Sequence, residues 1–160
     1  MLSKELQIGK AAEHFVACDL ILKGHNAFLA DQGLPFDLVI VSGAGGICRV
    51  QVKGTTKYTK KGERCTNPFY RWSLRRARGG TRYVSADECA AVAFVALDIM
   101  SIGYMDISAL VSAQHGGMVS CVDMYTRERP PLGRLYSTGK RRSPGRAKFI
   151  EDFATFRFPE

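Results

Sequence analysis

The sequence predicts an α/β domain, and three stretches carry this prediction. Residues 4–23 repeat apolar side chains at helical spacing, residues 35–53 hold two apolar runs joined by a glycine-rich turn, and residues 90–97 are apolar throughout. These patterns are typical of an amphipathic helix, a β-hairpin and a strand covered on both faces. With 160 residues, 46% of them hydrophobic, the chain is long enough for one domain with a sizeable core.

The predicted helix opens the fold. Ile8, Ala12 and Phe15 lie on one of its faces, and Gly24 stands where a helix can end in the left-handed conformation. Glu13 lies beside the apolar stripe, so we expect its carboxylate at the margin of the core.

Short strands follow the helix. We expect them at 27–31, 35–42 and 46–53, with a weaker alternation at 69–74, and we expect 90–97 in the middle of the sheet because both of its faces are apolar.

The C-terminal third is predicted less regularly. Ser108 is placed to cap a short helix over 109–115, and 119–125 is expected to add an edge strand. We therefore expect a core over 1–126 and a basic loop with an aromatic tail over 127–160. The tail is expected to dock on the domain or on a second subunit through aromatic side chains, namely Phe149, Phe153, Phe156 and Phe158.

Composition excludes some classes of protein. No stretch is long and apolar enough to predict a membrane span, and the N-terminus lacks a basic segment followed by an apolar run. The five cysteines are odd in number and form no C-x-x-C pair, which predicts neither a zinc site nor a disulfide framework. We therefore expect a cytoplasmic protein with no membrane partner.

The positive charge is segregated along the chain. The net charge is +8, and 19 of the 23 Lys and Arg fall in residues 49–82 and 127–148, which hold only Glu63 and Glu128 among the acidic residues. A solvated surface would mix the signs, whereas a basic stripe neutralises phosphates, so we expect a nucleic acid partner. The candidate DNA contacts, interleaved with Tyr58, Tyr70 and Trp72, are Lys57, Lys60, Lys61, Arg64, Arg71, Arg75, Arg76, Arg78 and Arg82. Among these, Arg64, Arg71 and Arg82 are candidates for reading base edges.

The predicted hairpin carries polar side chains where a buried sheet should have none. An antiparallel register about the turn at 43–45 places Asp37 opposite Gln51, and alternation places Lys53 on the same face as Gln51. A carboxylate, an amide and an ammonium then converge. Hard cations prefer oxygen ligands, so this combination indicates a divalent-metal site that cleaves phosphodiesters. Asp31 is an alternative carboxylate, although its place at a strand end favours a turn.

The order of these parts resembles the PD-(D/E)XK nuclease superfamily, which includes type II restriction enzymes and Holliday junction resolvases. Within it, the pattern is most similar to homing endonucleases encoded by group I introns, which also have Gln in the catalytic motif. The resemblance spans about residues 5–107, and two departures are the spacing Pro35-x-Asp37 and the neutral Gln51. It implies a restriction-endonuclease-like core: a mixed central sheet flanked by helices in the order αβββ-αβ, here with a basic C-terminal arm.

The resemblance also implies roles for four residues. Asp37 would be the direct metal ligand, Glu13 would orient a metal-bound water or supply a second carboxylate, and Gln51 would donate its amide oxygen. Lys53 would position the attacking water and offset charge on the phosphorane. The implied cofactor is Mg²⁺, with Mn²⁺ as a substitute, and the implied products carry a 5′-phosphate.

Several functions remain open at this point. The first is a Mg²⁺-dependent, site-specific DNA endonuclease that binds double-stranded DNA as a homodimer or homotetramer, because a two-fold symmetric duplex needs two active sites. The second is a structure-specific nuclease of the Holliday junction resolvase kind. The third is a non-catalytic DNA-binding module of nuclease descent, which the neutral Gln51 keeps open; the charge alone is also compatible with RNA binding.

Overall fold

The computed structural model describes residues 3–56, 58–59, 69–75, 83–112, 116–125, 147–149, 156 and 158. Within these residues one long helix is followed by short strands and a 3-10 helix. In chain order the elements are α1 (Lys4–Leu22), β1 (Asn26–Leu29), β2 (Leu38–Val41), β3 (Ile47–Thr55), β4 (Tyr58–Thr59), β5 (Phe69–Ser73), β6 (Ala91–Ala96), β7 (Ser101–Asp106), η1 (Ile107–Leu110), β8 (Cys121–Tyr125) and β9 (Ala147–Phe149).

The predicted N-terminal helix is confirmed with both of its ends. The Ser3 hydroxyl accepts a hydrogen bond from the Leu6 amide at the start of α1, as an N-cap does. At the other end Gly24 has a φ of 88° and its amide donates to the Ile21 carbonyl, so the helix stops where glycine permits the left-handed turn.

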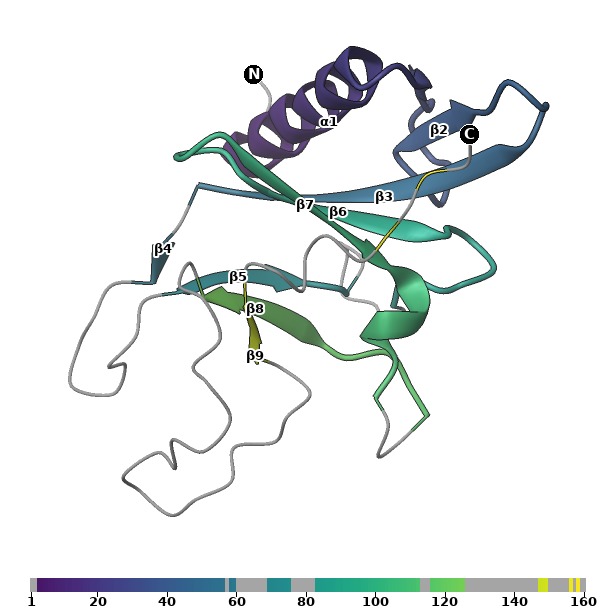
Figure 1. Ribbon diagram of the computed structural model, residues 1–160. Coiled ribbons are helices and arrows are strands. Elements are labelled where there is room, and N and C mark those ends of the chain that lie inside the picture. The colour runs from purple at the N-terminus through teal and green to yellow at the C-terminus, as the bar shows by residue number, and fades with distance from the viewer. Residues whose placement is uncertain are drawn as a thin grey trace.

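A five-stranded sheet, called sheet A, lies against α1 (Figure 1). Its order is β1-β2-β3-β6-β7, and the pair β3 and β6 is parallel while the other pairs are antiparallel. This mixed sheet with a covering helix confirms the predicted α/β class. The strands predicted at 27–31, 35–42 and 46–53 correspond to β1, β2 and β3.

A second sheet, called sheet B, covers the other face of sheet A, below it in Figure 1. Its order is β4-β5-β8-β9, and its inner side chains, among them Tyr70 and Trp72, pack on Val92 and Phe94 of β6. β6 is therefore buried along its whole length between two cores, as its unbroken apolar run predicted. Where the αβββ-αβ order implied a helix between β3 and β6, the described residues form β4 and β5.

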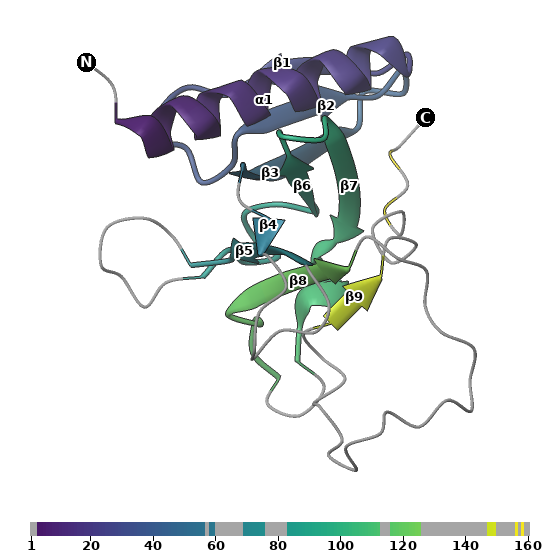
Figure 2. The ribbon, with the colours of Figure 1, turned by 90° about the vertical axis from the view of Figure 1, so that its left-hand side faces the viewer.

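Two predictions in the C-terminal third are wrong. Residues 119–125 were expected at an edge, but β8 pairs with both β5 and β9, which lies beside it in Figure 2. The expected helix over 109–115 is instead the 3-10 turn η1, capped by the Asp106 carboxylate and not by Ser108. It ends because Val111 forms a β-bridge with Met118.

The tail residues Phe156 and Phe158 pack against the core between α1 and sheet A. The Phe156 amide donates to the Tyr104 carbonyl of β7, and the Phe158 ring meets the Tyr104 ring edge-on at 4.9 Å. Phe158 also contacts His25 just after α1, with ring centroids 5.1 Å apart. Phe153 and residues 126–146 of the predicted basic arm lie outside the described residues.

Among the described residues, no helix has the length and apolar character needed to cross a bilayer.

Candidate active site

The hairpin of β2 and β3 has the register that the sequence predicted. Its turn is closed by the Ser42 amide, which donates to the Gly46 carbonyl, and by the Ser42 hydroxyl, which accepts from the Gly46 amide. Leu38 pairs with Val50, so one further step of the same register places Asp37 opposite Gln51.

Asp37 lies where β2 and β3 separate. The last residue of β2 that pairs with β3 is Leu38, whereas β3 continues to Thr55 and pairs with β6 over that stretch. The Asp37 amide donates to the Val50 carbonyl at 3.0 Å, and the Val52 amide donates to Asp37 Oδ2 at 2.7 Å. The carboxylate thus takes the place of a main-chain carbonyl beside β3, which fixes its position.

Gln51 completes the contact. Its side chain is only 8% exposed, and its amide nitrogen donates to the same Oδ2 of Asp37. In the described part of the chain, neither the Gln51 carbonyl oxygen nor Asp37 Oδ1 accepts a hydrogen bond. A buried amide oxygen and a part-buried carboxylate oxygen without a donor are costly, so this pair is suited to a ligand that supplies positive charge.

The pKa of Asp37 is raised, and desolvation by burial is the largest cause. The hydrogen bond from Val52 lowers it, the negative charge of Glu13 raises it, and the positive charges of Lys53 and Lys10 lower it. The partly buried environment therefore disfavours the charged form of Asp37 unless a cation lies nearby.

Glu13 and Lys53 approach this pair from two sides of sheet A. Glu13 is on α1, where its 14% exposed side chain forms an ion pair with Lys10 at 2.7 Å. Lys53 is half-buried on β3, two residues beyond Gln51, and faces the side of sheet A that sheet B covers. Both act electrostatically on Asp37, whereas Gln51 is joined to it by a hydrogen bond.

The donor set is weakly charged for a divalent-cation site. No group of three His, Cys, Asp or Glu within the described ranges could hold a metal ion. The oxygens at this point come instead from the Asp37 carboxylate and the Gln51 amide, with the Glu13 carboxylate near them. Oxygen donors are what Mg²⁺ prefers, and the two unpartnered oxygens are compatible with it, but the neutral amide predicts weak binding.

Seven of the predicted DNA contacts, Lys57, Lys60, Lys61, Arg64, Arg76, Arg78 and Arg82, lie outside the described residues. Arg71 and Arg75 are described, and both are on the sheet B side of the molecule. Arg71 forms an ion pair with Asp123 at 2.6 Å, and Arg75 Nε donates to the Tyr83 hydroxyl at 3.2 Å. Asp123 was not singled out from the sequence, because its partner is on a strand far away along the chain.

Two of the three aromatic residues interleaved with this basic stripe lie in the core, and the side chain of the third, Tyr58, lies outside the described part of the structure. Tyr70 and Trp72 are each 2% exposed and point into the core between the sheets. Tyr70 donates to Asp98, and the Trp72 indole donates to the Val95 carbonyl. The alternation of β5 turns them inward and turns Arg71 outward.

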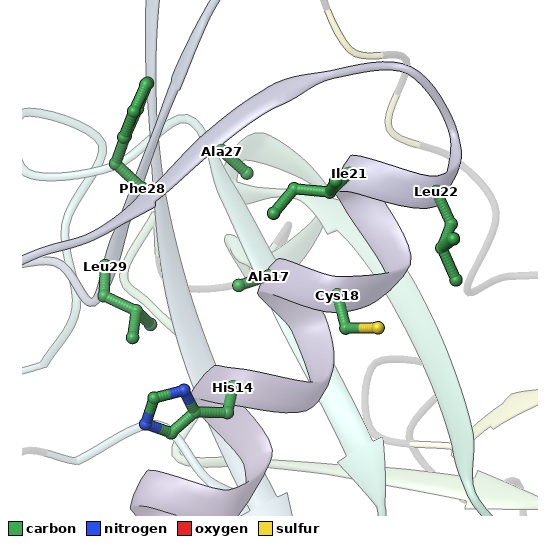
Figure 3. A pocket seen from close by; sticks show the side chains of 8 residues that line it. All are labelled: His14, Ala17, Cys18, Ile21, Leu22, Ala27, Phe28 and Leu29. Carbon is green, nitrogen blue, oxygen red and sulfur yellow. The ribbon is translucent and has the colours of Figure 1, made fainter.

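A hollow in the described part of the chain is lined by none of the four predicted site residues. The α1–β1 groove, of about 590 Å³, is mostly apolar and is shown in Figure 3; its lining residues are His14, Ala17, Cys18, Ile21, Leu22, Ala27, Phe28 and Leu29. It contains no acidic residue, and Leu22 and Phe28 are 81% and 58% exposed. This composition is that of a contact surface and not of a hydrolytic site.

Comparison by sequence matches the chain to no protein-family model and to no curated protein. Comparison by structure finds a bacterial homing endonuclease, I-Ssp6803I. The identity is 19%, the TM-score is 0.55, and the match covers 82% of this chain and 84% of that chain. The chain therefore has a fold similar to that of this bacterial homing endonuclease.

Proposed function

We propose that this protein is a DNA endonuclease that hydrolyses phosphodiester bonds with a divalent cation. The observation that carries the proposal is the part-buried Asp37–Gln51 pair at the point where β2 and β3 separate, with two oxygens that lack a donor in the described chain. The similarity of the fold to a homing endonuclease supports the same activity, and the segregated positive charge supports DNA as the substrate.

Each of the four site residues has a proposed task. Asp37, the Gln51 carbonyl and Glu13 would hold Mg²⁺ or Mn²⁺, which supplies the positive charge that activates water and stabilises negative charge on the phosphate. In the structure the Gln51 amide nitrogen donates to Asp37. A 180° rotation of this amide group would exchange the positions of its nitrogen and oxygen, so that the oxygen could bind the cation. Lys53 would orient the attacking water and neutralise charge on the phosphate, and Glu13 would accept a hydrogen bond from that water.

A second copy of the chain is part of the proposal. The strands of a duplex are related by two-fold symmetry, so cleavage of both calls for two active sites in a homodimer or homotetramer. The α1–β1 groove supports a contact between copies, because it carries no Lys or Arg on a chain with a net charge of +8. Beside it, β1 pairs only with β2 among the described strands, so its outer edge can pair with the same strand of another copy.

The deciding experiment is nicking of supercoiled plasmid with Mg²⁺ and with EDTA. We expect cleavage by the wild type with Mg²⁺ only, and Asp37→Ala and Lys53→Ala should each lower the rate on the order of 100-fold or more. Asp31→Ala, which removes an exposed carboxylate six residues away in the sequence, should cleave like the wild type. Equal activity of the wild type and Asp37→Ala would exclude this site.

The substrate class is tested by the same proteins. Faster cleavage of a four-way junction than of linear duplexes would favour a structure-specific nuclease. Binding of duplex DNA without any Mg²⁺-dependent cleavage would leave a non-catalytic DNA-binding module.

A further inference from the structure

We infer that Arg71, held in place by Asp123, reads a guanine in the major groove of duplex DNA from the outer face of sheet B. The inference rests on the proposed function for its ligand, DNA. It goes beyond that function by naming a residue that determines sequence preference and the base that it recognises.

The outer face of sheet B is built by strand alternation. On β5, Tyr70 and Trp72 point into the core while Phe69 and Arg71 face outward. Arg71 is directly opposite Asp123 on β8, and Phe69 packs near Tyr125 with ring centroids 5.7 Å apart. An arginine flanked by aromatic rings thus stands on a sheet face, and strands can enter the major groove.

Two hydrogen bonds fix the orientation of the Arg71 guanidinium. Nε donates to Asp123 Oδ1 at 2.6 Å and Nη2 donates to Asp123 Oδ2 at 2.7 Å, while the guanidinium stands over the Phe69 ring at 4.9 Å from its centroid. The residue Asp123 is 7% exposed, but the Arg71 side chain is 56% exposed. The carboxylate is therefore a buried support, and the arginine is presented to solvent with little rotamer freedom left to lose on binding.

The guanidinium N–H groups of Arg71 that do not bond Asp123 are arranged to contact a DNA base. Nη1 and the outer N–H of Nη2 make no hydrogen bond within the described part of the chain, and they form the fork at the far end of the guanidinium. That fork matches the paired acceptors O6 and N7 of guanine. Because Asp123 offsets the charge of Arg71, this side chain adds little general attraction for phosphates, which favours directional recognition.

The basic segments of the chain adjoin the strands of sheet B in the sequence. In the sequence, the residues between β4 and β5, those after β5 and those between β8 and β9 contain most of the Lys and Arg of the chain. Charges of this kind bind phosphates without regard to sequence. The discrimination between bases must then come from a positioned side chain such as Arg71.

The test is binding selection from a library of random duplexes in EDTA, so that no cleavage is needed. We expect the wild type to enrich guanine at a fixed position, and 7-deazaguanine at that position, which lacks the N7 acceptor, to weaken binding on the order of tenfold. Arg71→Lys keeps a cation beside Asp123 but loses the fork, so it should lose the guanine preference and the response to 7-deazaguanine. The matched control Arg49→Lys, at an exposed arginine on β3, should keep both.

A second variant separates recognition from folding. Asp123→Asn keeps Arg71 and one acceptor for it, and we expect a weaker guanine preference with an unfolding temperature near that of the wild type. The inference is overturned if Arg71→Lys retains the preference, if Arg71→Lys and Arg49→Lys weaken all sequences equally, or if the wild type selects no guanine. Such results with intact Mg²⁺-dependent nicking would leave the proposed function standing, whereas failure to bind any duplex would overturn both.

Discussion

The surroundings of Asp37 hold its carboxylate in place but also disfavour its negative charge. Its Oδ2 accepts from both the Val52 amide and the Gln51 amide, yet burial raises its pKa and so disfavours the charge that a metal ligand needs. Asn can keep the single accepting oxygen without carrying the charge. The site is therefore expected to lower stability in exchange for function.

The variant Asp37→Asn tests whether the charge of Asp37 lowers the stability of the folded protein. Because the pKa of Asp37 is raised in the folded protein, stability falls as pH rises from the unfolded-chain value through the folded value, and the full cost is present at neutral pH. We expect Asp37→Asn to raise the unfolding temperature at pH 7 and the gain to shrink as the pH falls toward the ordinary range of Asp. The exposed Asp31→Asn should show no such gain, and a lower unfolding temperature for Asp37→Asn at pH 7 would contradict the prediction.

Gln51→Glu tests the charge of the donor set. A second full carboxylate beside Asp37 should strengthen Mg²⁺ binding, so the Mg²⁺ concentration for half-maximal nicking is expected to fall by roughly tenfold. Titration of the nicking rate with Mg²⁺ measures this. An unchanged requirement would show that residue 51 does not contact the cation.

The sequence predicted the meeting of Asp37 with Gln51 because a symmetric turn fixes the register of a short hairpin. It could not predict the bond from Val52 to Asp37, which depends on where the two strands separate. It also missed Asp123, because its pairing with Arg71 requires the register between β5 and β8, and no turn joins those strands directly.

At the scale of elements, the packing of α1 on β3 depends on Gly54. A Cβ at this position would lie 2.6 Å from the Ala12 Cβ and 3.3 Å from the Ile8 carbonyl oxygen. The helix that carries Glu13 can therefore approach the strand that carries Gln51 and Lys53 only because residue 54 has no side chain.

Gly54→Ala should force α1 away from the strand and lower the free energy of unfolding by roughly 1–3 kcal/mol. Gly9→Ala is the matched control: nothing lies within 4 Å of its added Cβ, so helix propensity should raise stability by about 0.5–1 kcal/mol. Urea unfolding measures both, and equal effects of the same sign would contradict the close approach.

Elements with a strong local pattern were predictable, and those that depend on distant pairing were not. The periodic helix 4–23 and the two-sided apolar run 90–97 correspond to α1 and β6. By contrast, β8 became an inner strand because β9, which comes much later in the chain, pairs with its free edge. A local capping signal at Ser108 was overridden when Val111 paired with Met118.

At the scale of the whole molecule, α1, sheet A and sheet B form three layers that carry different kinds of residues. The side of α1 and sheet A carries the carboxylates and the apolar α1–β1 groove, and the segments that adjoin the strands of sheet B in the sequence contain most of the positive charge. The sequence predicted the basic segments but not the second sheet, because β4 and β5 are short and only weakly patterned.

The proposed contact between copies is tested by the mass of the protein in solution. Leu22→Glu and Phe28→Glu place a charge in the α1–β1 groove, and each is expected to weaken self-association by about 2 kcal/mol or more. Light scattering should show the wild type as a dimer or tetramer and the variants shifted toward the monomer. Ile99→Glu, at an exposed position between β6 and β7, should leave the mass unchanged, and equal masses for all four proteins would exclude this groove.

The aromatic pair Phe156 and Phe158 joins parts of the molecule that are made at very different times. Phe158 touches both His25, just after α1, and Tyr104 on β7. On the ribosome, the helix and its sheet emerge long before these rings do. Tyr104 therefore stays exposed until Phe156 and Phe158 have been synthesised. We expect a nascent chain stalled before Phe156 to be cleaved by proteases faster than the released protein.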